Sequence, residues 1–140
     1  MTPATPRSPG WLRRLACAVY DALLVAAFVL IASLPVAALA GDVSEGWRLQ
    51  LFRLYVFIAI GAYFVGSWSR GGQTLALKTW RMRIETADGT PVTARRALHR
   101  FLLASLGTAM LGATYVWAFF DREQQFLHDR LAGTRLVDIR

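Results

Sequence analysis

The chain has few of the residue types on which disulfide, zinc and hydrolytic sites depend. Its single cysteine, Cys17, excludes an internal disulfide. Its two histidines, His99 and His128, lie far apart with no thiols to join them, which argues against a zinc site. The sequence also lacks a glycine-rich phosphate loop and a serine nucleophile elbow. It therefore predicts a protein that is not an enzyme and that holds no metal and no cofactor.

Charged residues are scarce as well, at 18% of 140 residues, against roughly a quarter in soluble domains. Apolar residues make up 55%, more than a chain of this length can hide from water. The net charge of +7 would suit a nucleic-acid-binding protein. The basic residues cluster beside apolar segments, however, which is typical of membrane proteins. We therefore expect the lipid bilayer and its anionic headgroups as partners, and no nucleic acid.

Three apolar segments approach the ~20 residues that a helix needs to span a bilayer. They cover residues 15–40, 54–69 and 101–120. We expect residues 1–12 to form a flexible tail and residues 13–138 a single transmembrane domain. The predicted fold class is an all-α integral membrane protein with three apolar helical segments and a small cytoplasmic loop and strand element.

The distribution of basic residues predicts the orientation. The first segment follows Arg7, Arg13 and Arg14, with no acidic residue before it. The connector over residues 70–100 carries seven Lys or Arg against two acidic residues. By the positive-inside rule both parts are cytoplasmic, and the first two segments form a hairpin with a short outer turn.

The third segment has two interpretations. As a full crossing, which we slightly favour, it leaves residues 121–140 on the outer side. Residues 79–86 and 133–139 have strand-like patterns, however, and if they pair, both lie on the cytoplasmic side. The third segment would then be re-entrant, with a bend that Gly107 and Gly112 permit.

The N-terminal part also resembles a secretory signal. Arg13 and Arg14 precede an apolar run, which is followed by the breaker Pro35 and by a cleavage-like triplet at residues 38–40. The long stretch before the apolar run, and Asp21 beside it, argue against cleavage. In either case two more apolar segments follow, so the product remains a membrane protein.

Asp21 is the strongest functional signal, because it lies about two turns inside the first apolar segment. A carboxylate at the centre of a spanning helix costs roughly +2.5 to +3.5 kcal/mol, and somewhat less at this depth. Such a residue usually faces a bundle interior or a wet cavity. Arg14 shares its helix face, but seven residues rise about 10.5 Å and side chains lean toward the N-terminus. We therefore expect the partner of Asp21 to come from another helix or from the cytoplasmic layer.

The remaining charged residues have open interpretations. Arg14 is expected to reach lipid phosphates or a group on the loop or the tail. Asp129 lies in QQFLHDRLAGT, which predicts a short amphipathic helix, and it is either solvated or, with a cytoplasmic tail, a partner of Arg14. At the foot of the third segment, Arg95, Arg96 and Arg100 are expected to bind lipid headgroups.

Together these residues resemble the RDD family of small bacterial membrane proteins. Arg14, Asp21 and Asp129 match the residues that name the family, and GGQTLALKTWRMRIETADGTP is similar to its loop. The matching loop residues are Gly72, Gln73, Thr74, Leu75, Lys78, Asp88 and Gly89. Ala76 stands where a glycine is usual. The resemblance covers about residues 11–138.

The resemblance implies a multi-pass protein of the bacterial inner (plasma) membrane. The family has no known molecular function; transport of unidentified ligands is suspected, and cation/proton exchange is proposed for some members. In that role Asp21 would couple the ion, Arg14 and Asp129 would gate or orient it, and Gln73, Thr74 and Lys78 would form a supporting loop. The alternative is a non-catalytic scaffold or accessory protein whose Arg/Asp network is structural. Three short helices can hardly enclose a pathway alone, so transport would require a homo-oligomer or a membrane partner protein.

Overall fold

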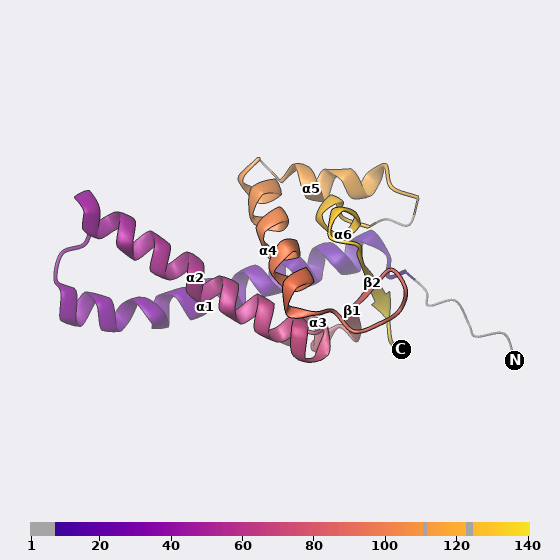
Figure 1. Cartoon of the computed structure of the whole chain (residues 1–140), viewed down its shortest axis with the longest axis horizontal. Coiled ribbons are helices and arrows are strands. Elements are labelled where there is room, and N and C mark those ends of the chain that lie inside the picture. Colours follow the sequence, from indigo (N-terminus) through magenta and orange to yellow (C-terminus); the bar gives the residue numbers. More distant parts are fainter. Residues whose placement is uncertain (1–7, 111, 123–124) are drawn as a thin grey trace, which may run out of the picture.

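A computed structural model describes residues 8–110, 112–122 and 125–140, without the side chains of residues 113 and 114. Two long helices, α1 (Trp11–Ala40) and α2 (Gly46–Gly71), form a hairpin. Figure 1 shows the hairpin extending to one side, with the short α1–α2 connector at its tip. The other elements gather around the opposite end, which we call the base: α3 (Leu75–Thr79), β1 (Met82–Thr86), α4 (Ala94–Ala109), α5 (Ala113–Val116), η1 (Trp117–Phe119), α6 (Leu127–Leu131) and β2 (Thr134–Asp138).

Both hairpin helices are long and apolar enough to cross a membrane. At about 1.5 Å per residue, the 30 residues of α1 exceed the ~30 Å thickness of a hydrocarbon core. The most apolar stretch of α1 has no buried residue, and that of α2 has only 6% buried. The hairpin predicted from the first two segments is confirmed. Its second helix begins earlier than predicted, because the amphipathic stretch WRLQLFR continues the helix.

The third apolar segment, predicted over residues 101–120, is not one continuous helix. α4 ends at Ala109, and Gly112 has a φ of +75°, in the left-handed region that glycine tolerates. From there α5 and η1 lead away from α4 (Figure 1). The arrangement with three full crossings is therefore not found, because the chain turns at Gly112. The other proposed bend, Gly107, lies within α4.

The two predicted strands do pair. β1 and β2 form an antiparallel ladder in which Met82 lies opposite Asp138 and Ile84 opposite Leu136. The tail therefore lies at the same end of the hairpin as the loop that follows α2, as the re-entrant interpretation requires.

α4 packs against α2 through aromatic contacts. The ring of Phe101 lies 5.2 Å from that of Phe57 and 6.2 Å from that of Phe64, measured between centroids. A Cβ atom at Gly61 would lie 3.0 Å from the Phe101 ring, so glycine at this position leaves room for the ring. This contact brings α4 steeply across the hairpin, as Figure 1 shows.

Candidate functional site

Asp21 is held by a hydroxyl group from another element, as the sequence predicted. Thr74 Oγ1 donates a hydrogen bond to Asp21 Oδ2 over 2.9 Å. Thr74 is also the N-cap of α3, where the same oxygen accepts a hydrogen bond from the Leu77 N–H over 3.2 Å. One hydroxyl can donate and accept together, so the cap and the carboxylate are bound at once. The other carboxylate oxygen, Asp21 Oδ1, is buried and has no hydrogen-bond partner among the described residues.

The loop before α3 is fixed to the backbone of β1. Gly72 has a φ of +68°, and a Cβ atom there would lie 2.3 Å from the carbonyl oxygen of Ile84. The Ile84 N–H donates to the Gly72 carbonyl over 2.7 Å, and Gln73 Nε2 donates to the Met82 carbonyl over 2.8 Å. Glycine is required for this close approach, and the two bonds set the position of Thr74 beside Asp21.

Asp129 is completely buried, at 0% exposure, so its solvated interpretation does not hold. It forms an ion pair with Arg100 of α4, and His128 Nε2 lies 3.7 Å from Asp129 Oδ1. Burial alone would raise the pKa of Asp129, but the guanidinium of Arg100, with a contribution from Arg14, outweighs burial and lowers it. Burial lowers the pKa of His128 to about 4, so this imidazole is neutral at pH 7.

Arg14 joins the start of α1 to the tail. Its side chain is 1% exposed, and its Nε donates to the Pro9 carbonyl over 2.8 Å. Its Nη2 lies 3.5 Å from the carbonyl oxygen of Leu136 in β2. The neighbouring Arg13 forms an ion pair of 2.6 Å with Asp138 at the end of β2. Of the two expected roles for Arg14, the structure shows contact with the tail.

Gln125 binds the backbone of the same β2 residue that Arg14 contacts. It is 1% exposed, and its Oε1 accepts a hydrogen bond from the Leu136 N–H over 3.1 Å, while its Nε2 donates to the Leu136 carbonyl over 3.4 Å. The amide thus satisfies both backbone groups of Leu136, as a neighbouring strand would. Nothing in the sequence pattern marked Gln125, because its partner is a backbone position and not a complementary side chain.

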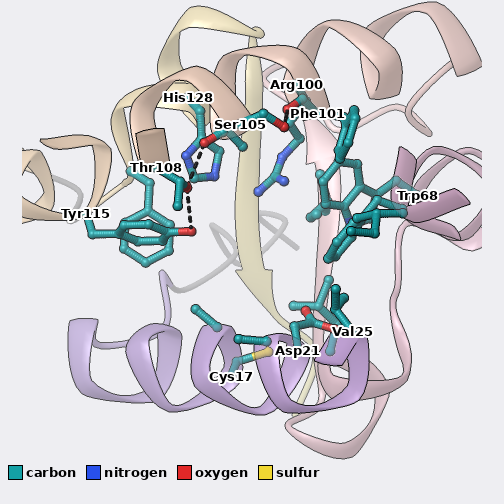
Figure 2. Close-up of a pocket in the computed structure, with 18 of the residues that line it drawn as sticks. Cys17, Asp21, Val25, Trp68, Arg100, Phe101, Ser105, Thr108, Tyr115 and His128 are labelled. Carbon is teal, nitrogen blue, oxygen red and sulfur yellow. Dashed lines mark hydrogen bonds between the residues drawn. The ribbon is translucent and has the colours of Figure 1, made fainter. Parts of the chain in front are cut away.

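A cavity of about 580 Å³ lies between the hairpin and α4. Its walls are mainly apolar and aromatic, and they include Phe64, Phe101 and Tyr115. Figure 2 shows Asp21 entering the cavity from α1 and Arg100 entering from the opposite wall. The cavity therefore combines an apolar interior with charged groups at two separate places.

Arg100 stacks on Trp68 of α2. Its Cζ lies 4.3 Å from the centroid of the indole ring, and each residue is 5% exposed. In the part of the chain that the structure describes, Arg100 Nε and Trp68 Nε1 are buried without a hydrogen-bond partner. The predicted headgroup role does not fit Arg100, because its guanidinium is buried between Trp68 and Asp129.

The structure brings some of the predicted site residues together and separates others. Those that line the cavity are Arg14, Asp21 and Arg100; those that do not are Gln73, Thr74, Lys78, Arg95, Arg96 and Asp129. Thr74 and Asp129 nonetheless act on the cavity, because each binds a side chain that lines it. Lys78, Arg95 and Arg96 are exposed. Ala76, at the usual glycine position, is fully buried in the core of the base.

Sequence patterns did not mark Trp68, Tyr115 or His128 as residues of one site. All three line the cavity, and they come from three different elements. An aromatic residue near the end of an apolar segment is equally typical of the headgroup zone. The position of His128 beside Asp129 is the one local signal that could have indicated its place.

The sequence model of the RDD family matches residues 8–133, a range that includes Arg14, Asp21, the Gly72–Lys78 loop and Asp129. No curated protein and no solved structure matches the chain. The matched range covers most of the 140 residues and agrees with the resemblance seen in the sequence, so the chain belongs to the RDD family.

Proposed function

We propose that this membrane protein is a non-catalytic transport component of the bacterial inner membrane, in which Asp21 takes up and releases a proton or a monovalent cation. One observation carries the proposal: Asp21 lines a cavity and keeps one buried oxygen without a hydrogen-bond partner among the described residues. Thr74 holds the other oxygen and so orients the carboxylate. A carboxylate within an apolar segment is costly, and residues of this kind commonly mark ion and proton pathways.

In this proposal Arg14 and Asp129 support the site and are not gates. Both are buried in the layer that joins the tail to the start of α1. Asp129 fixes Arg100, which in turn lines the cavity. Asp129 thus positions the wall opposite Asp21, whereas Arg14 holds the tail against α1, the helix that carries Asp21.

A pathway would require a second copy of the chain or a membrane partner. The described chain has two helices that are long and apolar enough to cross, and much of their apolar surface faces outward. Two helices cannot enclose a conduit by themselves. A homo-oligomer would cover part of this surface, and lipid would cover the rest, with anionic headgroups near the exposed Arg95 and Arg96.

A scaffold or accessory role is the second candidate, and the buried network of the base favours it. Arg100, Asp129 and Gln125 tie α4, α6 and β2 together. Buried polar groups in membrane proteins often serve only to join elements. In this role the cavity would carry nothing, and Asp21 would act only through its bond to Thr74.

Flux through liposomes distinguishes the two candidates. The wild type, Asp21→Asn and the control Asp42→Asn would be reconstituted, and proton movement driven by sodium or potassium gradients would be followed with a pH-sensitive dye. Asp42 lies in the exposed connector at the hairpin tip, so the control makes the same chemical change away from the cavity. We expect flux in the wild type and in Asp42→Asn and none in Asp21→Asn, with melting temperature and oligomeric state unchanged.

A silent wild type combined with a misassembled Asp21→Asn variant would instead identify the scaffold. Equal flux through the wild type and Asp21→Asn would remove Asp21 from the mechanism.

A further inference from the structure

Two opposite walls of the cavity include side chains with unpaired polar atoms: an acceptor on one wall and two donors on the other. From this arrangement we infer that the occupant of the cavity is a zwitterionic amphiphile, with an ammonium group at one end, a phosphate or carboxylate group at the other and an apolar body. The inference rests on the proposed function, in which Asp21 takes up a cation, and it assigns that cation to the ammonium group of a larger ligand. Its grounds are the two polar walls, the balance of charge and the apolar surface between the walls.

The wall formed by α1 offers an acceptor. Asp21 Oδ2 is already bound to Thr74, which leaves Oδ1 as the unpaired atom. A carboxylate oxygen accepts hydrogen bonds and does not donate them. An ammonium N–H fits it best, because it supplies both the donor and the opposite charge.

The opposite wall offers two donors. The Nε–H of Arg100 and the Nε1–H of Trp68 are both buried without partners among the described residues. The two side chains are stacked, with Arg100 Cζ 4.3 Å from the indole centroid, so both donors belong to one small patch. Buried N–H groups are rarely left without an acceptor. A phosphate or carboxylate oxygen would satisfy them.

The balance of charge favours a ligand that is neutral overall. Two guanidinium groups, of Arg14 and Arg100, line the cavity, and two carboxylates balance them, Asp21 on the cavity wall and Asp129 behind Arg100. His128 also lines the cavity and is uncharged at neutral pH. A zwitterion bound between the walls adds no net charge to this balance, and each of its charged ends meets a group of opposite sign.

The space between the walls is apolar and large. Val25, Phe57, Phe64, Phe101 and Ala104 line it, and its volume of about 580 Å³ lies within the usual range of sites for small organic molecules. An ion at Asp21 would contact only a small part of this surface. An aliphatic or aromatic body would fill it.

Three probes test the inference on the full chain in maltoside micelles, with dissociation constants measured by native mass spectrometry. Lysophosphatidylethanolamine carries the ammonium, the phosphate and one acyl chain. Lysophosphatidylglycerol with the same chain lacks the ammonium, and phosphoethanolamine lacks the chain. We expect the first probe to bind about tenfold more tightly than the second, because only the first supplies a charged donor to Asp21.

Two variants examine the walls separately. Asp21→Asn should abolish the preference for the ammonium probe. Trp68→Phe keeps an aromatic ring and removes one donor, so it should weaken both acylated probes about fivefold and leave their ratio unchanged. Asp42→Asn, outside the cavity, should change neither value. The ratio of the two probes is internal to each sample and does not depend on the fraction of folded protein.

Absence of the preference in the wild type, or its persistence in Asp21→Asn, would overturn the inference. Binding of phosphoethanolamine as tight as that of lysophosphatidylethanolamine would contradict the apolar body of the inferred ligand. Binding of the acylated probe alone would support it and would indicate a membrane lipid. Flux that depends on Asp21, without any probe preference, would overturn the inference and leave the proposed function standing. A preference for the ammonium probe without any flux would support the inferred ligand class and contradict the proposed transport.

Discussion

The outer part of the hairpin exposes large apolar side chains, whereas the base buries charged ones. In the hairpin, large apolar side chains such as Leu30, Leu34 and Leu39 are 66% to 88% exposed. In the base, charged side chains such as Arg14 and Asp129 are almost fully buried. The hairpin therefore depends on lipid to cover it, whereas the base depends on the pairing of its own polar groups. The same substitution should thus have very different consequences in the two regions.

The largest effect is expected for Asp129→Asn. It removes the charge that compensates Arg100 while the guanidinium remains buried, which should destabilise the protein by about 3–5 kcal/mol. Thermal melting in detergent, followed by helical circular dichroism, would measure the loss. Glu85→Gln is the matched control, because its partner Arg135 is partly exposed and the change should cost less than about 1 kcal/mol. Equal losses would mean that burial does not distinguish these two pairs.

Gly72→Ala should have the next largest effect. The new Cβ would lie 2.3 Å from the carbonyl oxygen of Ile84, at a φ of +68° that alanine rarely adopts. We expect a loss of about 2–3 kcal/mol, together with weaker fixation of Thr74. Gly71→Ala is an adjacent control, because a Cβ there meets nothing within 4 Å. A melting temperature of Gly72→Ala no lower than that of Gly71→Ala would show that the loop can move away from β1.

Low pH should destabilise the folded protein through protonation of His128, which is buried in the base of the molecule. Burial lowers its pKa from 6.5 to about 4, so between these values the unfolded chain binds a proton that the folded chain does not. Stability from this group is complete above pH 6.5 and is lost as the pH falls through about 4, with about 2 kcal/mol lost by pH 5. Asp129, whose pKa is lowered, keeps its charge in this window. His128→Gln should melt with a shallower dependence on pH between 7 and 5, and an unchanged slope would contradict the assignment.

The hairpin was predictable and the base was only partly so, for a physical reason. A long run without charged residues, such as residues 22–41, is stable mainly in lipid, and in lipid the backbone must form a helix to satisfy its hydrogen bonds. The strand pairing followed from two short alternating patterns. The third apolar segment is not one continuous helix, because apolar composition does not show where a chain turns; among the described residues of the turn, Gly112 has a positive φ.

The arginines of α4 show the same limit. Arg95, Arg96 and Arg100 formed one basic cluster in the sequence. Arg96 and Arg100 are one turn apart on a face that meets the tail, where Arg96 Nη1 lies 3.4 Å from the Gly133 carbonyl. The burial of Arg100 was decided by Asp129, 29 residues further along the chain. No local sequence pattern indicates a partner at that distance. For Asp21, by contrast, a polar partner from another element could be predicted, because a carboxylate in an apolar helix is costly without one.

The smallest effect is expected at the outer hairpin, where protein side chains cover little of the apolar surface in the described chain. Leu34→Ala, at a side chain that is 66% exposed, should change stability in micelles by less than about 0.5 kcal/mol. Met82→Ala, at a fully buried position of the base, should cost about 2–5 kcal/mol. Both are measured by thermal melting at several protein concentrations. A large loss in Leu34→Ala that grows with protein concentration would mean that this surface packs against a second copy of the chain, because a side chain covered only by detergent has no neighbours to lose.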